Sequence, residues 1–368
     1  MHPMTKSIQR ELDDFFQRLS KSEFQIRTVT KGALTQARAK LHPDAFRALD
    51  RVARDGFYKE APYYKWDKYR ILAVDGSTAV LPQHESIRQE FGVHQFGPNA
   101  DSPRSLARMS MLYDPLNGIT LDGQIAGYGT SEKELCQGHL EHVKPGDLLI
   151  FDRFYAGFDL MRQLHDLKVD FLFRMKNGWW KKVREFKSLE NDDQVVTFDT
   201  KKGDIKARLI RVKLADGKEQ ILCTSLMNKK FSAEDFGDLY RSRWGIEETY
   251  KTLKNWIELE NFSGKTALAI KQDFYSKILL MNLCTVYSHP VSEQIKKEKE
   301  GYQINHVQSL ALISVFPIPL FLHQKVKDVL HWFDKIISKT IDKIRPGRKF
   351  ERKKIVFRTK FSMNYKRL

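Results

Sequence analysis

The sequence is poor in cysteine, and its few cysteines are far apart. Only three of the 368 residues are cysteines, namely Cys136, Cys223 and Cys284. No two of them have the two-residue spacing of zinc ribbons and redox-active thiols, and three separated thiols are too few for a disulfide framework. The sequence therefore predicts reduced, partly buried thiols in a cytosolic protein, without a cysteine-ligated metal.

Long hydrophobic runs are also missing. Residues 1–16 contain no apolar segment of the kind that a signal peptide needs. The most apolar long stretch, residues 309–322, is too short to span a bilayer and contains Pro317 and Pro319. The sequence predicts no membrane partner and a cytoplasmic location.

Acidic residues are outnumbered by basic ones. There are 63 Lys and Arg against 46 Asp and Glu, which gives a formal net charge of +17. This balance favours a polyanionic partner, with nucleic acid before a membrane surface. The hydrophobic content of 41% is enough for a core, and the length suits two or three domains.

Residues 1–66 predict a helical N-terminal DNA-binding domain. Apolar residues recur at helical spacing from Ile8 to Leu19, a second helical pattern follows over residues 31–41, and Pro43 suits the first turn of a third helix. Lys31 and Arg38 on the middle helix are candidate DNA contacts of a helix-turn-helix-like reader. A solvated helical cap on a larger domain explains the same pattern equally well.

Between residues 67 and 176 the pattern becomes one of strands and helices. Apolar or alternating runs predict, in order, three strands, a helix, a strand, a helix and a strand, at residues 70–75, 107–113, 119–128, 131–142, 148–152, 158–167 and 171–175. This order is the ribonuclease H-like arrangement, in which helices flank a mixed sheet. The predicted fold is therefore α/β, with the first part of its core in this segment.

The remainder of the chain is predicted to interrupt and then complete this core. Residues 177–229 alternate in strand fashion and predict a β-rich insertion, with an ordinary continuation of the sheet as the alternative. Residues 230–262 contain the helix that completes the core, and residues 263–368 form a helical C-terminal region.

The C-terminal tail is strongly basic. From Lys343 onward it contains eleven Lys or Arg against a single acid, Glu351, and aromatic residues are interleaved among the cations. Arg345, Arg348 and Lys349 are therefore candidate DNA contacts, and a flexible solvated end is the alternative.

One short segment carries four chemically different polar groups at helical spacing. At 100° per residue, Tyr240, Arg243, Glu247 and Lys254 fall within an arc of roughly 60° on one helix. An apolar stripe, formed by residues 246, 250, 253 and 257, lies roughly 90° away and can anchor the helix. A carboxylate among phosphate-seeking cations indicates metal-assisted chemistry on a polyanion, although mixed-charge helix faces are more often solvated.

Asp75 and Asp152 each end a predicted buried strand, where α/β sheets usually bind ligands. If the strands are neighbours, the two carboxylates lie side by side and repel unless a cation is bound. Mg²⁺ accepts such oxygen ligands, and Glu247 would supply a third carboxylate. Three acids can hold two ions about 4 Å apart for an in-line phosphoryl displacement, while Arg243 and Lys254 suit phosphate clamping.

The combination resembles the IS4-family insertion-sequence transposases of the DDE type. The resemblance rests on Asp75-Gly76-Ser77, Asp152-Arg153-Phe154-Tyr155 and the Tyr-x2-Arg-x3-Glu-x6-Lys signature from Tyr240 to Lys254. It implies a ribonuclease H-like core with a β-strand insertion between the second aspartate and the glutamate. It also implies Asp75, Asp152 and Glu247 as the catalytic triad, binding two Mg²⁺ ions that Mn²⁺ can replace, and Tyr240, Arg243 and Lys254 as DNA-phosphate contacts.

The activity that this resemblance implies is cut-and-paste transposition in a prokaryotic nucleoid. The implied partners are double-stranded DNA, as terminal inverted repeats and as target, and a second copy of the chain on paired ends. A hairpin intermediate is typical of the family, but residues 220–225 lack the tryptophan on which relatives can stack an expelled base, and Trp179 and Trp180 are the nearest aromatic pair. A general ribonuclease H-like nuclease and a DNA-binding regulator without catalysis are the alternatives.

Overall fold

The computed structural model describes most of the chain, namely residues 7–20, 27–95, 103–176, 178, 180–200, 203–214, 217–314 and 325–345. Its contacts divide the chain into two compact units. The sheet unit consists of Ala61–Thr78 and Ala107–Thr252, and the helical unit of Met1–Glu60, Ala79–Leu106 and Leu253–Leu368. Each unit is thus assembled from separated stretches of chain, and the five-segment division drawn from the sequence stays a prediction.

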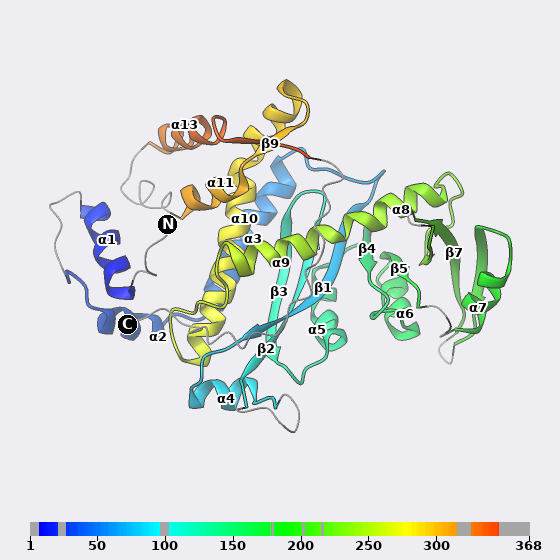
Figure 1. The fold of residues 1–368 in the computed structure, drawn as a ribbon, viewed down its shortest axis with the longest axis horizontal. Coiled ribbons are helices and arrows are strands. Elements are labelled where there is room, and N and C mark those ends of the chain that lie inside the picture. The colour runs from blue at the N-terminus through cyan, green and yellow to red at the C-terminus, as the bar shows by residue number, and fades with distance from the viewer. Residues whose placement is uncertain are drawn as a thin grey trace. The chain divides into compact units, whose positions relative to one another are not determined.

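An eight-stranded mixed sheet organises the sheet unit (Figure 1). The strands are β1 (Arg70–Val80), β2 (Leu106–Asp114), β3 (Ile119–Gly127), β4 (Asp147–Phe151), β5 (Asp170–Arg174), β6 (Asp193–Phe198), β7 (Ile205–Lys213) and β8 (Glu219–Thr224). They are ordered β3-β2-β1-β4-β5-β8-β7-β6, with β4 parallel to both β1 and β5, and β2 antiparallel to β3. The order of the first five strands confirms the predicted ribonuclease H-like mixed sheet.

The strands that were expected to form an insertion extend this same sheet. β8 pairs antiparallel with β5, so that Arg174 lies opposite Leu222, and β7 and β6 follow in antiparallel order. The Thr224 hydroxyl strengthens the junction by donating to the Phe171 carbonyl at 2.7 Å. The predicted β-rich insertion is thus seen as three strands added to one edge of the core sheet.

Helices pack on the faces of this sheet. They are α5 (Glu132–His139), the short 3₁₀ helix η1 (Leu140–His142), α6 (Phe158–Asp166), α7 (Lys181–Ser188), α8 (Ala233–Ser242) and α9 (Trp244–Asn255). α8 buries Phe236, Leu239 and Tyr240 in one cluster with inward side chains of β1, β4, β5, β7 and β8. Gly237 permits this close approach, because a Cβ there would lie 2.8 Å from the Val212 side chain. α8 is thereby held firmly over the strands.

The helical unit is built around a helix of 32 residues, α10 (Ala267–Glu298). Its other elements are α1 (Ile8–Ser20), α2 (Lys31–Ala39), α3 (Asp44–Glu60), α4 (Glu85–Phe91), α11 (His306–Ile313), α13 (Val326–Ile337), β9 (Tyr302–Ile304) and β10 (Ile341–Lys343). Asp50 of α3 accepts hydrogen bonds from Arg54 at 2.7 Å and from Asn282 of α10 at 2.6 Å.

No helix within the described ranges, α10 included, combines the length and the apolar character that crossing a membrane requires.

The cysteines are buried free thiols, in keeping with the sequence. Burial raises the pKa of Cys136 and of Cys284 to about 12, and it raises the pKa of Cys223 as well. Thiols of this kind are poor nucleophiles, since the thiolate is the reactive form. The cysteines thus contribute to packing, and the chemistry of the protein must come from other groups.

Candidate active site

Asp75 and Asp152 follow the last paired residues of two adjacent parallel strands. The β1–β4 pairing ends with Val74 opposite Phe151, so the next residue on each strand is an aspartate. β4 stops there because the chain turns, and the Phe154 amide donates to the Asp152 carboxylate at 2.7 Å. The prediction that the first strand also ends at Asp75 is wrong, since β1 continues to Val80 beside β2. The predicted side-by-side placement of the aspartates agrees with this register.

A buried ion pair at the opposite end of these strands stabilises their register. Arg70 and Asp147 are register partners, and the guanidinium donates to both carboxylate oxygens at 2.8 and 2.7 Å. Both side chains are less than a tenth exposed. Slippage by one residue would separate this pair inside the protein, where an unpartnered charge is costly. The pair therefore helps to keep Asp75 level with Asp152.

The segment that contains the signature is two helices rather than one. α8 ends at Ser242 and α9 begins at Trp244, with Arg243 between them. Arg243 keeps helical dihedral angles, but the hydrogen bonds around it tighten: its amide donates to the Tyr240 carbonyl at 3.2 Å, and its own carbonyl accepts from Ile246 at 3.1 Å. The prediction of one unbroken helix is therefore wrong at Arg243, and Tyr240 and Glu247 lie on different helices.

Arg243 lies between two of the three candidate carboxylates. Its Nη1 is 3.4 Å from Oδ2 of Asp75, and its Nη2 donates to Oε1 of Glu247 at 2.6 Å. The guanidinium side chain is only 8% exposed. Its Nε is buried without a hydrogen-bond partner among the described residues. The guanidinium therefore acts as the counter-charge of Asp75 and Glu247 and still has a donor to spare.

The pKa of Asp75 shows that the three candidate carboxylates influence one another electrostatically. Burial raises the pKa of Asp75 to about 6, and the Asp152 and Glu247 carboxylates act in the same direction. The Arg243 charge and the Gly76 amide oppose the increase without cancelling it. The positive charge around Asp75 is thus too small to hold its pKa at the ordinary value of an aspartate.

The donor set fits a divalent cation in kind. Carboxylate oxygens are the ligands that Mg²⁺ prefers, and a bound cation would oppose the burial and the carboxylate repulsion that together raise the pKa of Asp75. Across the described ranges, however, no three acidic, histidine or cysteine side chains are already gathered closely enough to hold a metal ion. Binding would therefore require the carboxylates to converge and the Arg243 contacts to loosen.

A second set of residues, which the sequence did not indicate as functional, supports the Asp75 backbone. The Tyr250 hydroxyl donates to the Asp75 carbonyl at 2.9 Å, and the Ser110 hydroxyl reaches it at 3.4 Å. Ser110 is 2.9 Å from Nε2 of His139, whose Nδ1 is 2.7 Å from the Asp122 carboxylate. Tyr250 was expected only as an apolar anchor, and no local pattern marks the other three, because they meet across β2, β3 and α5.

Tyr240 lies close to the same groups. The side chain is buried, and burial raises the pKa of its phenol. The charges of Arg243 and Arg174 lower that pKa and the Asp152 charge raises it. The Arg243 guanidinium lies over the Tyr240 ring, 5.8 Å from its centroid. Tyr240 is therefore a neutral hydrogen-bond donor beside Arg243.

The family of the chain follows from its similarity to a known domain. The profile described as Transposase DDE domain matches residues 66–283, more than half of the chain. The chain belongs to this family. The match includes every residue from Asp75 to Lys254 that the sequence marked as catalytic or phosphate-binding, and it confirms the resemblance to DDE transposases.

Two relatives of this DDE domain are informative. The transposase InsG for insertion sequence element IS4 of Escherichia coli K12 is 24% identical over 303 residues, which is 76% of this chain and 65% of that protein. The candidate transposase y4zB of Sinorhizobium fredii is 25% identical over 191 residues, or 49% of this chain and 52% of that protein. The chain thus spans about two thirds and about half of the lengths of these relatives.

A solved structure with some likeness to the chain is the piggyBac transposase synaptic complex with hairpin DNA. The TM-score is 0.46 at 13% identity, over 88% of this chain and 67% of that one. A likeness of this size supports no inference about this chain, and the fold assignment rests on its own strand order.

The remaining candidate DNA contacts that the structure describes belong to the helical unit. Lys254 is on the last turn of α9, in the part of the chain assigned to the helical unit, where burial lowers its pKa and Glu260 acts in the opposite direction. Lys31 and Arg345 are exposed, while Arg348 and Lys349 lie outside the described residues. Their roles as DNA contacts stay predictions.

Arg38 makes an extensive set of contacts inside the helical unit. Its Nε donates to Gln272 at 2.9 Å, one terminal nitrogen contacts Asp273 at 3.0 Å, and the other donates to the Ser263 hydroxyl. The guanidinium joins α2 to α10, which is a structural role that its position in a basic helix did not reveal.

Of the aromatic candidates for base stacking, Trp180 is engaged in packing. Its ring stacks on Phe158 with centroids 4.1 Å apart and meets Phe198 edge-on at 5.0 Å. Trp179 lies outside the described residues. Trp244, next to Arg243, is 62% exposed. Trp180 therefore contributes to the packing of aromatic side chains.

Proposed function

We propose that the protein is a DNA transposase that cuts and rejoins DNA by metal-dependent phosphoryl transfer. The observation that carries the proposal is the register of β1 and β4, which makes Asp75 and Asp152 neighbours while Arg243 links Asp75 to Glu247. Membership of the DDE transposase-domain family and the net charge of +17 support it.

In this proposal, Asp75, Asp152 and Glu247 hold divalent ions, Mg²⁺ in the first place and Mn²⁺ as a substitute. Two such ions, when bound, activate the attacking oxygen and stabilise the leaving oxygen of an in-line displacement. The side chains supply the negative charge that attracts the ions, and the Arg70–Asp147 pair and the Tyr250 hydroxyl keep the backbone of Asp75 in place.

Arg243 and Tyr240 would hold the DNA strand. Once the carboxylates have another counter-charge, the Arg243 guanidinium can offer its fork of donors to a phosphate, for which arginine geometry is well suited. The Tyr240 hydroxyl stays protonated, because burial raises its pKa, and can donate to the same strand. Lys254 is proposed as a further phosphate contact.

The proposed substrate is double-stranded DNA, as the terminal inverted repeats of a mobile element and as a target, with a pair of chains acting on paired ends. Cleavage, a hairpin intermediate and strand transfer are all phosphoryl transfers, so one triad can serve each of them. The proposed setting is a prokaryotic nucleoid.

The test uses the purified full-length chain and linear DNA that carries the terminal repeats found beside the coding sequence. Mg²⁺-dependent cuts at the repeat ends are expected, and they should disappear in Asp75→Asn, Asp152→Asn and Glu247→Gln. Glu248→Gln is the matched control, because Glu248 is 69% exposed and forms an ion pair with Lys251. Equal cleavage by the two glutamate variants would contradict the site.

The products separate the alternatives. Equal cutting of DNA with and without the repeats would indicate a general nuclease. Tight, salt-sensitive binding without any metal-dependent product would indicate a DNA-binding regulator.

A further inference from the structure

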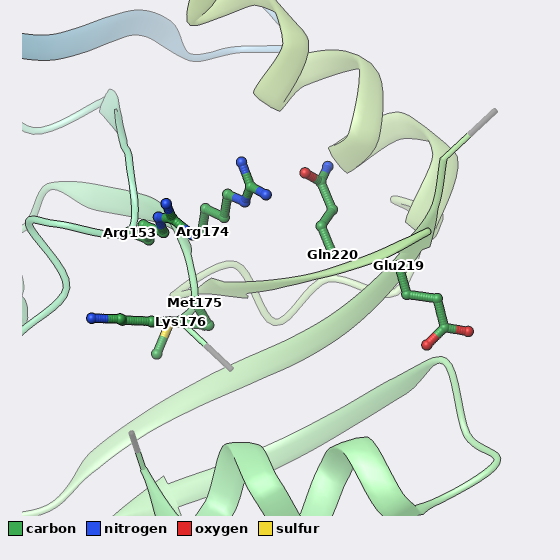
Figure 2. Close-up of a pocket in the computed structure, with 6 residues that line it drawn as sticks. All are labelled: Arg153, Arg174, Met175, Lys176, Glu219 and Gln220. Carbon is green, nitrogen blue, oxygen red and sulfur yellow. The ribbon is translucent and has the colours of Figure 1, made fainter. Parts of the chain in front are cut away.

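A pocket of about 230 Å³ lies beside the second aspartate, within the sheet unit. Its lining consists of Arg153, Arg174, Met175, Lys176, Glu219 and Gln220 (Figure 2). Arg153 directly follows Asp152, and Arg174 is the last residue of β5, the next strand along. Glu219 and Gln220 begin β8, which pairs with β5, and the Met175 amide donates to the Ile221 carbonyl at 2.8 Å. The pocket is therefore built by backbone that also positions Asp152.

The pocket has an excess of positive charge. Three cations and one acid line it, and the Glu219 carboxylate already accepts from Nη1 of Arg211 at 3.1 Å. Figure 2 shows the Glu219 carboxylate directed away from Arg174 and Gln220. In the described part of the chain, the guanidinium groups of Arg153 and Arg174 have neither an ion pair nor a hydrogen bond. Two forked donors are thus left for an anion.

The pocket adjoins the candidate active site at the ends of β4 and β5. The pairing of these strands places Phe151 opposite Phe173, so the next residues on the two strands are Asp152 and Arg174. The charges of both also act on the pKa of the buried Tyr240 phenol. Figure 2 shows the Arg174 guanidinium and the Gln220 amide on the same side of their strands, with Arg153 alongside Arg174. Arg174 thus places a donor on the strand next to the one that carries Asp152.

We propose that this pocket binds a backbone phosphate of the DNA strand, close to the phosphate that is cut. The proposal rests on the proposed function and adds the subsite that aligns the strand. A phosphodiester is a compact anion that matches paired guanidinium donors. The volume is below the range of pockets for drug-sized ligands, so it suits a phosphate with part of its sugar. The Gln220 amide adds a further donor at its edge.

The first test measures DNA binding without metal and without cleavage. Affinity for a duplex is determined in EDTA over a series of salt concentrations, for the full chain and for Arg153→Gln and Arg174→Gln. Each substitution should reduce the slope of log K against log salt by about one unit, because one phosphate contact is lost. Arg174→Lys keeps the charge and should keep the slope, which distinguishes lost charge from misfolding.

Arg241→Gln is the matched control on the same unit. Arg241 is 72% exposed and already paired with Asp238 at 2.9 Å, so its removal should leave the slope unchanged. A slope for Arg174→Gln equal to that of the wild type would overturn the proposal. So would a slope that changes equally in Arg174→Gln and Arg241→Gln.

The second test identifies the phosphate. Single uncharged methylphosphonates are placed at successive positions around the cut site of a repeat-bearing duplex. One position near the cut should weaken binding to the wild type and have no further effect on Arg174→Gln, since both changes remove the same contact. Independent effects at every position would contradict a phosphate subsite.

These tests separate the subsite from the proposed function. A protein that shows the Arg174 effect but never cuts DNA with Mg²⁺ would contradict the transposase proposal alone. A protein that cuts normally and whose DNA binding ignores Arg174 would contradict the subsite alone.

Discussion

Replacement of Asp75 by asparagine is expected to stabilise the metal-free protein at neutral pH and to abolish metal-dependent cleavage. The Asp75 side chain is only 20% exposed, and burial raises its pKa from 3.8 to about 6, with help from Asp152 and Glu247. At neutral pH the folded protein must therefore keep this carboxylate charged in an unfavourable place. Asparagine has nearly the same shape and carries no charge.

The magnitude follows from the difference in pKa. A shift of roughly two units corresponds to about 3 kcal/mol of folding free energy. The favourable contact with Arg243 is already included in this shift, because the Arg243 charge lowers the pKa of Asp75. The expected net gain is therefore about 3 kcal/mol.

The sign of the pH dependence is fixed by the direction of the shift. Because the pKa is raised in the folded state, folded Asp75 holds a proton that the unfolded chain has released. Its favourable contribution is complete below about pH 4 and is lost as the pH rises through about 6. The advantage of Asp75→Asn should therefore appear across that window and be full at pH 8.

The assay is urea unfolding in EDTA at pH 4.5 and pH 8, followed by tryptophan fluorescence. Asp166→Asn is the control, since Asp166 is an aspartate of the same unit that is 65% exposed, and its change should stay within about 0.5 kcal/mol. Adding Mg²⁺ at about a hundred times its dissociation constant should stabilise the wild type by about 2.7 kcal/mol and Asp75→Asn much less. An Asp75→Asn protein less stable than the wild type at pH 8, or one with the same gain at both pH values, would refute the reasoning.

Two further substitutions test contacts that hold each unit together. Arg38→Ala should lower the free energy of unfolding by about 2–4 kcal/mol, because it leaves Asp273 partly buried without its guanidinium; unchanged thermal unfolding combined with weaker DNA binding would instead make Arg38 a DNA contact. His139→Phe should cost about 2–3 kcal/mol, because Ser110 and Asp122 lose a shared buried partner, and it should slow cleavage by loosening the support of Asp75. Wild-type melting and cleavage in that variant would show that the hydrogen-bonded chain is dispensable.

Local patterns were sufficient where hydrophobic periodicity and chain order carry the information. The strands around β1, β4 and β5 are buried on both faces and read as short apolar runs, so their positions and their order could be predicted. The adjacency of Asp75 and Asp152 depended in addition on β1 and β4 being parallel neighbours, which only the sheet order shows.

Local patterns failed where a distant partner decides the outcome. A helical pattern does not reveal that the backbone hydrogen bonds tighten at Arg243. The side chain of that residue contacts the carboxylates of both Asp75 and Glu247, and Asp75 is distant in the sequence. Likewise, a basic helix does not reveal that Arg38 is bound by α10.

By itself, the sequence determined the order of the core strands along the chain, the three candidate acids and the resemblance to a family, because each of these depends on residue type and spacing. Only the tertiary structure decided which charged side chains have a partner of opposite charge and which do not. Glu219 is paired with Arg211, whereas the guanidinium groups of Arg153 and Arg174 have no partner in the described part of the chain. The physical reason is that pairing between charges depends on distances of a few ångströms between residues far apart in the chain.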